Sequence, residues 1–426
     1  MMFLVITGLV LMTLLGAPLF TVLTAAAMAG FTMLDIDLSV MAIELYRIAD
    51  TPILVALPLF TFTGYLLAES RTASRLVGLT RAFLGWMPGG LAIVAFVVCA
   101  LFTAFTGASG VTIVAMGALL YPALKQDGYA ENFSLGLVTT SGSLGLLLPP
   151  SLPLILYGII AQQMDAGADI SIEKLFAAGI LPALLMIFLL SAWSIRANRH
   201  NPTPVTRFSV KNCLSALRAA AWEVPLPIFV FAGIYSGYFA VSEAAAVSAM
   251  YVLVVEMLVY REVKWSRLPS LIRESMVMVG GILLILGVSL AFTNFLIDAQ
   301  VPMKLFALCQ QFITNKWVFL ILLNLFLLIL GTMLDIFSAI VIMVPLMLPV
   351  AMAYGIHPVH LGIIFLANMQ IGYFTPPVGM NLFIAGYRFN KPIMAIYQAT
   401  IPFMLVLLLA VLIITYWPGL SLFLIS

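Results

Sequence analysis

Apolar runs of about 20 residues recur along the whole chain, and each is long enough to cross the hydrocarbon core of a bilayer. Only 8% of the 426 residues are charged, whereas soluble domains carry about 25% charged residues. The folded chain therefore exposes most of its surface to lipid. We predict an all-α polytopic membrane protein embedded in a bilayer.

Nine crossings are predicted, at 3–31, 52–69, 131–163, 174–195, 222–238, 241–260, 274–298, 358–386 and 393–420. The first is expected to be one retained helix, because it is too long for a signal peptide. Fifteen of the 19 basic residues fall on one predicted side, in joints around 71–81, 125, 196–218, 261–273 and 388–391. The positive-inside rule places that side and the N-terminus in the cytoplasm, and the C-terminus in the periplasm. We expect a multi-pass protein of a bacterial inner membrane.

The chain contains an internal repeat at an offset of 227 residues. Five helix-breaking positions coincide without a gap: Pro122 with Pro349, Gly128 with Gly355, Gly145 with Gly372, and Pro149-Pro150 with Pro376-Pro377. Apolar helices resemble one another easily, whereas coinciding glycines and prolines are more specific. One extra crossing between the copies inverts the second copy. Inverted repeats with broken helices near the midplane are typical of secondary transporters.

Two further apolar stretches, 88–122 and 317–350, each begin and end on one predicted side and are interrupted at 106–110 and 331–335. We interpret them as re-entrant hairpins, whose tips are tolerated in a membrane where they are buried in protein or line a cavity. The first repeat then spans 1–195, with scaffold helices 1–70, arm helix 71–86, hairpin 88–122, broken helix 131–163 and closing helix 174–195. A basic cytoplasmic joint and the inverting helix occupy 196–240. The second repeat spans 241–426, with scaffold helices 241–298, arm helix 300–313, hairpin 317–350, broken helix 358–386 and closing helix 393–420.

Each Pro-Pro pair removes two helical hydrogen bonds. Proline has no N–H, so the pairs free the carbonyls four residues earlier, at 145–146 and 372–373. Free carbonyls at the end of a half-helix form a negative oxygen cluster that suits Na⁺. We predict two Na⁺ sites, one of Thr103, Thr106, Gly145, Leu148 and Ser151, and one of Gly331, Gly372, Thr375 and Val378. The alternative is that Pro-Pro only kinks each helix, and that water or nearby hydroxyls satisfy the backbone.

Polar residues near the same breaks are the candidates for binding a solute. They are Ser109, Ser143, Asp335 and Asn381, with Arg47 near the outer mouth. Carboxylates inside a membrane often mark ion or substrate routes, although Asp335 could equally cap its own half-helix. The serines could bond their own backbone, and Arg47 could reach lipid head groups instead. Helix N-termini after each Pro-Pro pair would favour an anionic solute.

Several motifs, in this order, resemble the large membrane subunit of TRAP transporters of the DctM or SiaM type. They are PLF at 58–60 with Gly64, GGLA at 89–92, TGASG at 106–110, LPPS at 148–151, SIEKLFAAGILP at 171–182 and GYFTPPVG at 372–379. The likeness covers essentially the whole chain. It implies an elevator mechanism, sodium coupling, a small four-helix membrane subunit and an extracytoplasmic solute-binding protein. The nine crossings leave no room for the small subunit, which is expected to be a separate chain.

The resemblance also implies an organic acid as solute, with sialic acid the first candidate and a C4-dicarboxylate the alternative. A carboxylate or ion transporter of similar architecture that needs no binding protein is the other alternative. The chain has no P-loop motif and no set of catalytic side chains, so we do not expect an enzyme. A channel would need a continuous polar lining, whereas the polar residues here gather at two breaks. Nothing in the sequence indicates nucleic-acid binding.

Overall fold

All regular elements that the structure describes are helices. The structure is a computed structural model that describes residues 2–49, 51–87, 89–164, 170–199, 208–313 and 315–425. In the first half the α-helices are α1 (Met2–Leu14), α2 (Leu19–Met33), α3 (Ser39–Ala49), α4 (Ala56–Glu69), α5 (Thr72–Leu84), α6 (Gly90–Thr106), α7 (Ser109–Gln126), α8 (Glu131–Ser141), α9 (Leu152–Gln163) and α10 (Ile172–Ala197). Short 3₁₀ helices lie at Pro52–Val55 (η1) and Leu144–Leu147 (η2).

The second half has the same helical character. Its α-helices are α11 (Val210–Ala219), α12 (Pro225–Tyr235), α13 (Val241–Val254), α14 (Leu268–Asp298), α15 (Val301–Phe312), α16 (Lys316–Met333), α17 (Ile336–Ala353), α18 (Pro358–Gly372), α19 (Met380–Phe389), α20 (Ile393–Tyr416) and α21 (Gly419–Leu422). A π-helical turn, η3 (Val255–Val259), continues α13, and a 3₁₀ turn, η4 (Trp265–Arg267), precedes α14.

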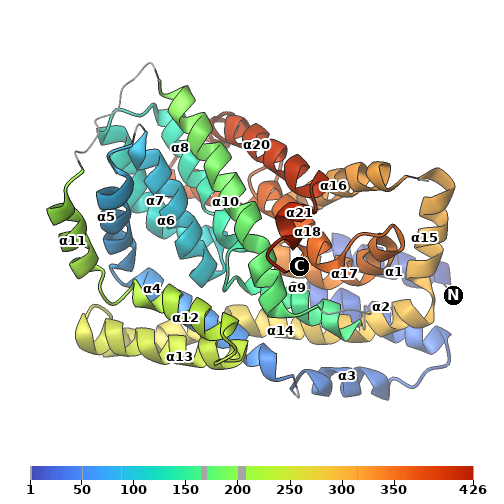
Figure 1. Ribbon diagram of the computed structural model, residues 1–426. Helices are drawn as coiled ribbons and strands as arrows, with labels where there is room; N and C mark the ends of the chain where they lie inside the picture. The colour runs from blue at the N-terminus through green and yellow to red at the C-terminus, as the bar shows by residue number, and fades with distance from the viewer. Residues whose placement is uncertain are drawn as a thin grey trace.

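The two halves of the chain interlock rather than forming separate bodies. Helix α8 packs against α20, α9 against α17, and α10 against both α18 and α20. Helix α14 runs along one side of the molecule and packs against α4, α2 and α3 (Figure 1). The most enclosed part of the fold is the region of α8, α9 and α18, where nearly every residue is buried. The broken segments therefore lie in the core.

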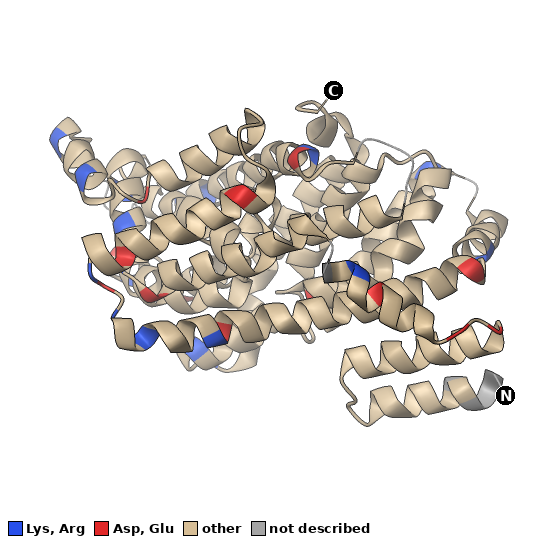
Figure 2. Cartoon of the chain, turned by 90° about the horizontal axis from the view of Figure 1, so that it is seen from below, with Lys and Arg blue, Asp and Glu red and all other residues tan. Residues whose placement is uncertain are grey.

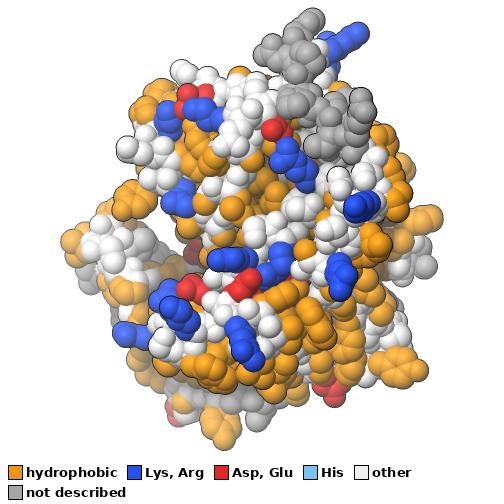
Figure 3. Space-filling model, turned by 90° about the vertical axis from the view of Figure 1, so that its left-hand side faces the viewer, with side chains coloured by type: hydrophobic (Ala, Val, Ile, Leu, Met, Phe, Trp, Pro, Cys, Tyr) orange, Lys and Arg blue, Asp and Glu red, His pale blue; other side chains and the backbone are white. Residues whose placement is uncertain are grey.

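Eight helical segments among the described residues are long and apolar enough to cross a membrane. Large apolar side chains such as Leu325, Leu405 and Phe188 point outward from them. The long helices are almost free of charged residues, and most Lys and Arg residues lie toward one end of the molecule (Figure 2). Viewed onto that end, basic side chains are spread over the face with a few acidic ones among them (Figure 3). This distribution fits a protein that spans a bilayer.

The predicted single crossing at 3–31 is wrong. Gly16 adopts a φ of +78°, and Pro18 precedes α2, so the chain turns back between α1 and α2. The two helices pack against each other, and the N-terminus lies at the same end of the molecule as α15 (Figure 1). The count of nine crossings, and the cytoplasmic N-terminus that rested on it, therefore lose their basis.

Other boundaries differ by smaller amounts. The amphipathic helix α3 lies in a stretch that was predicted to be a joint, and the predicted inverting helix is confined to α12. The scaffold helix expected at 274–298 begins at Leu268 in the structure. Residues 88 and 200–207, part of the predicted hairpin and joint, lie outside the described residues.

Candidate functional site

The predicted breaks fall in two helical hairpins and two interrupted helices. Only Gly107 and Ala108 separate α6 from α7, and only Leu334 and Asp335 separate α16 from α17. A positive φ of +64° at Gly107 makes the first connection sharp. The first interrupted segment consists of α8, η2 and α9, and the second of α18 and α19. The Pro149-Pro150 and Pro376-Pro377 bonds at the interruptions are cis.

Each carbonyl that loses its helical N–H partner at a Pro-Pro pair accepts a hydrogen bond from another donor. The Gly145 carbonyl accepts the N–H of Leu148 at 3.0 Å, and the Leu146 carbonyl accepts the Ser151 hydroxyl at 2.6 Å. In the second break, the N–H groups of Thr375 and Asn381 bond the carbonyls at 372 and 373, at 3.1 and 2.9 Å. A carbonyl oxygen has two lone pairs, so each can still accept from a second partner.

The Thr103 hydroxyl joins the first hairpin to the first break. It lies 2.9 Å from the Gly142 carbonyl, 2.8 Å from the Cys99 carbonyl and 2.7 Å from the Thr112 hydroxyl. At Gly145 a Cβ atom would lie 2.1 Å from the Ala100 carbonyl oxygen and 2.7 Å from Thr103 Cβ. Only glycine permits η2 to pack this closely on α6. The structure thus brings Thr103 and Gly145 together.

The first hairpin also presents a buried hydroxyl without a partner. Thr106 Oγ1 makes no hydrogen bond within the described part of the chain, although its residue is fully buried. Against its backbone lies Gly64 of α4, where a Cβ would be 2.5 Å from Thr106 Cα. A buried hydroxyl left unsatisfied costs about 1–3 kcal/mol. The Thr106 oxygen could therefore bind a cation such as Na⁺, which is coordinated by oxygen atoms.

Two predicted solute residues meet across the two halves of the chain. The Ser109 hydroxyl donates to Asn381 Oδ1 at 2.7 Å, which ties the start of α7 to α19. Both side chains are buried, and Asn381 Nδ2 has no acceptor in the described residues. Ser143, by contrast, bonds the carbonyl of Thr140 in its own segment at 3.1 Å. The alternative that a serine bonds its own stretch of backbone thus holds for Ser143, but not for Ser109.

The second hairpin approaches the second break through two glycines. An ideal Cβ on Gly372 would lie 2.5 Å from the carbonyl carbon of Gly331, and one on Gly331 would lie 3.1 Å from Gly372 Cα. The ends of α16 and α18 therefore touch through their backbones. The Thr375 hydroxyl is bonded to the Ile371 carbonyl at 2.8 Å, and Val378 is exposed. Gly331, Gly372 and Thr375 gather here, whereas the side chain of Val378 points away from the core.

Asp335 caps its own helix. Its Oδ1 accepts the N–H groups of Phe337 and Ser338, each at 3.0 Å, and its Oδ2 contacts the Ser338 hydroxyl. The remaining N–H at this end, that of Ile336, bonds the Tyr373 hydroxyl at 2.6 Å. These contacts correspond to an N-cap. Asp335 is exposed, so the capped carboxylate can still meet a ligand from outside.

Arg47 lies apart from these clusters. It belongs to α3, where it pairs with Glu44 at 3.6 Å and keeps 64% of its side chain exposed. The two residues border a cavity of about 30 Å³ between α3, α9 and α14. Arg47 therefore lies beside the C-terminal end of α9, and the structure does not group it with Ser109 and Asn381.

Three groups at the site were missed by sequence reasoning: the Thr112 hydroxyl, the Gly142 carbonyl and the Tyr373 hydroxyl. Thr103 and Thr112 lie at nearly equal distances along the chain from the Gly107 turn, and this spacing is a signal that pairs them across a hairpin. No group of three or more His, Cys, Asp or Glu side chains suited to a metal lies in the described residues. Any cation at these breaks would be held by hydroxyl and carbonyl oxygens.

Known proteins resemble this chain over almost its full length. Residues 6–420 match the family model described as the tripartite ATP-independent periplasmic transporter, DctM component. The C4-dicarboxylate TRAP transporter large permease protein DctM of Pseudomonas aeruginosa is 35% identical over 90% of this chain and 88% of that protein. The isethionate TRAP transporter permease protein DctMQ of Oleidesulfovibrio alaskensis is 33% identical over 96% of this chain and 64% of that protein.

A solved structure supports the fold. The crystal structure of the Alcanivorax borkumensis YdaH transporter superposes with a TM-score of 0.64, at 15% identity, over 89% of this chain and 87% of that one. At this identity the likeness concerns the fold alone. The family match and the curated relatives identify the chain: it belongs to the DctM family of TRAP transporter large permeases.

Proposed function

We propose that this permease imports a small organic anion in symport with Na⁺, together with a separate small membrane subunit and an extracytoplasmic solute-binding protein. The observation that carries the proposal is the convergence of two hairpins and two interrupted helices on buried oxygen clusters. Membrane transporters use unwound backbone of this kind to coordinate Na⁺. The family description, a tripartite periplasmic transporter, supports the two partners.

For the first Na⁺ site we propose the Thr106 hydroxyl with the carbonyls at 145 and 148 and the hydroxyls of Thr103 and Ser151. The Thr106 oxygen is buried and has no hydrogen-bond partner in the described residues, and a bound cation would be that partner. The second site would use the carbonyls of Gly331, Gly372 and Val378 with Thr375. Bound Na⁺ would supply positive charge near the tips, and the chain would provide the oxygen cage and the exclusion of water.

For the solute we propose contacts with Ser109 and Asn381, whose Nδ2 has a free donor. Relatives whose names state a C4-dicarboxylate and isethionate both carry anions. C4-dicarboxylates are therefore tested first, beside sialic acid. Asp335 remains a proposed contact for a hydroxyl or amine of the solute, because its carboxylate is exposed.

We further propose that the two halves are inverted repeats and that transport follows an elevator mechanism. In this scheme α5 and α15 are the arms, and the two hairpins with the interrupted helices move together. The packing of α9 against α17 and of α19 against α7 joins the two halves and supports a common moving body. The small subunit would bind outside that body, on the scaffold.

The test is uptake into liposomes that contain the permease and its small subunit, with the binding protein outside. Labelled C4-dicarboxylate and sialic acid are compared with an inward sodium gradient and with choline in its place. We expect uptake of at least one anion that requires both sodium and the binding protein. Uptake that is unaffected by replacing sodium would remove both proposed Na⁺ sites as coupling sites. Uptake without the binding protein would favour the alternative, a carboxylate or ion transporter that needs no binding protein.

A further inference from the structure

Three carboxyl groups surround one guanidinium in the first turn of α5. One comes from the turn before α12, and the other two come from η3 and the residues after it. Arg75 of α5 pairs with Glu223, with Glu262 at 2.6 Å and with Glu256 at 3.5 Å. These four side chains, which we call the Arg75 cluster, are buried or nearly so, with exposures of 12%, 4%, 19% and 1% for Arg75, Glu223, Glu262 and Glu256. If all were ionised, the cluster would carry two uncompensated negative charges.

Two of the three carboxylates are fully bonded. Glu223 accepts from Arg75 and from the Tyr260 hydroxyl at 2.9 Å. Glu262 accepts from Arg75 and from the N–H of Arg71 at 2.8 Å. The Tyr260 ring also lies 3.9 Å from the guanidinium carbon of Arg75. Each of these two glutamates therefore has a charge-assisted hydrogen bond from Arg75 and a second donor.

Glu256 is different. Its Oε1 accepts a hydrogen bond from the Thr72 hydroxyl at 2.9 Å and the longest of the three contacts from Arg75, at 3.5 Å. Its Oε2 is buried and has no hydrogen-bond partner in the described part of the chain. The charged groups that act on it there are Arg75, Glu262 and Glu223, and two of these repel its negative charge. A buried carboxylate beside like charges is strongly disfavoured, whereas a neutral carboxyl group is not.

The backbone holds Glu256 in this position. It lies in the π-helical turn η3, and the Glu256 carbonyl accepts the N–H groups of Glu262 and Val263 at 2.9 and 3.3 Å. This arrangement folds residues 256 and 262 onto the same guanidinium. Turns of the π type inside α-helices occur frequently at functional sites.

Arg75 remains a cation in these surroundings. Burial opposes its charge, but the hydrogen bonds and charges of Glu262 and Glu223 outweigh burial and raise the pKa of the guanidinium. The charge that one cation leaves uncompensated must therefore be removed from a carboxylate. A proton on one carboxyl group removes one negative charge without any further ligand.

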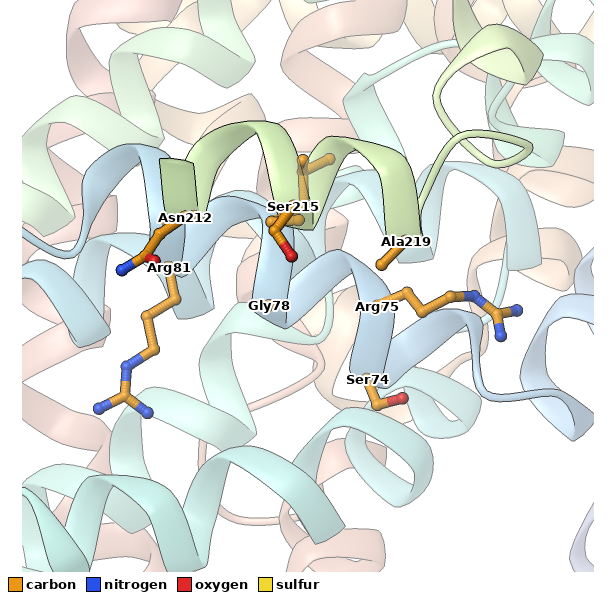
Figure 4. Close-up of a pocket in the computed structure, with 10 residues that line it drawn as sticks. Ser74, Arg75, Gly78, Arg81, Asn212, Ser215 and Ala219 are labelled. Atoms are coloured by element: carbon orange, nitrogen blue, oxygen red, sulfur yellow. The ribbon is translucent and has the colours of Figure 1, made fainter. Parts of the chain in front are cut away.

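A groove borders the cluster at Arg75. This groove of about 530 Å³ lies between α5 and α11, and its lining includes Ser74, Arg75, Gly78, Asn212 and Ser215. Figure 4 shows α11 above α5, with Ser215 directed into the space between them and Arg75 extending away along α5. The groove borders Arg75, and Glu262 keeps 19% of its side chain exposed, so solution reaches the edge of the cluster.

We propose that the Arg75 cluster is a proton-binding site, that Glu256 holds the proton, and that this proton fastens arm helix α5 to the turn before α12, which carries Glu223, and to η3 and the residues that follow it. With the proton bound, one cation and two carboxylates remain, and no ionised group lacks a partner. When the proton leaves to water, Glu256 becomes a buried anion facing Glu223 and Glu262, and the attachment of α5 weakens. The proton site is separate from the proposed Na⁺ sites and does not depend on them.

Infrared spectroscopy of the full chain in lipid nanodiscs tests this directly. We expect the carbonyl stretching band of a protonated carboxyl group at neutral pH, which disappears as the pH is raised. Glu256→Gln should abolish the band, Glu256→Asp should shift its position, and Glu274→Gln, the same change at a more exposed glutamate outside the cluster that pairs with Arg267, should retain it. A wild-type spectrum without such a band, or one that Glu256→Gln leaves unchanged, would overturn the proposal.

Amide hydrogen exchange of α5 tests the structural consequence. After correction for the intrinsic pH dependence of exchange, protection of α5 should fall in the wild type as the band is lost, and should stay constant in Glu256→Gln. Equal pH dependence in both proteins would contradict the proton's role in fastening α5. Protection that depends on sodium or potassium at constant pH would show that a metal cation, rather than a proton, occupies the site.

Discussion

Thr106 gives the sharpest test of the sodium proposal at the scale of one residue. Its hydroxyl is buried without a partner in the described residues, so Thr106→Val removes an unsatisfied polar atom and keeps the side-chain shape. The unfolding temperature should be unchanged or higher. If Thr106 binds Na⁺, the sodium concentration for half-maximal uptake should rise about tenfold, which corresponds to about 1.4 kcal/mol. Thr106→Ser, which keeps the hydroxyl, is the control and should behave as the wild type. Uptake by Thr106→Val with unchanged sodium dependence would exclude this hydroxyl as a ligand.

The Ser109–Asn381 contact is a second test at the residue scale. It joins positions 272 residues apart at 2.7 Å. Ser109→Ala and Asn381→Ala should each lower the apparent affinity for the transported anion, and the double variant should lose less than the sum of the two. The expected coupling energy is about 0.5–1.5 kcal/mol, the usual net value of one hydrogen bond. Ser143→Ala is the matched control, because its hydroxyl bonds only its own segment at Thr140. Additive losses would mean that the two side chains act independently.

At the scale of helices, the close approach of α16 and α18 depends on two glycines. Gly372→Ala would place a Cβ 2.5 Å from Gly331 backbone atoms, so the helices must separate. We expect a loss of about 1–3 kcal/mol in stability, typical of overpacking, together with impaired transport. Gly78→Ala on α5 is the control, because no heavy atom lies within 4 Å of the added Cβ. Thermal unfolding in detergent measures both variants, and equal midpoints would show that the hairpin tolerates the extra atom.

The helix boundaries also show what the sequence can predict. Both interruptions and both hairpin connections were predicted, because Gly107 and the Pro-Pro pairs disrupt helical hydrogen bonds locally. The turn at Gly16 and Pro18 carries the same kind of signal, but the length of the apolar run was given more weight. The Arg75 cluster could not be predicted, because Glu256 is 181 residues from Arg75 and only tertiary packing brings them together. Capping of α17 by Asp335 was weighed from sequence alone, since N-cap contacts are local.

At the scale of the whole molecule, the α1–α2 turn changes the expected topology. The N-terminus lies at the same end as α15, opposite the end where most basic residues lie (Figures 1 and 2). If the basic end faces the cytoplasm, the N-terminus and Cys309 both face the periplasm.

Cysteine labelling tests this orientation. In a background with Cys99 and Cys213 replaced by alanine, labelling of Cys309 shows on which side of the membrane α15 lies. In a cysteine-free background, Lys211→Cys on α11 or a cysteine in an N-terminal extension reports on its own position. A membrane-impermeant maleimide added to spheroplasts should label Cys309 and the extension, whereas Lys211→Cys should react only in inside-out vesicles. Labelling of the extension only in inside-out vesicles would restore a cytoplasmic N-terminus, and would require α1 and α2 to cross the membrane in some other way than as a hairpin.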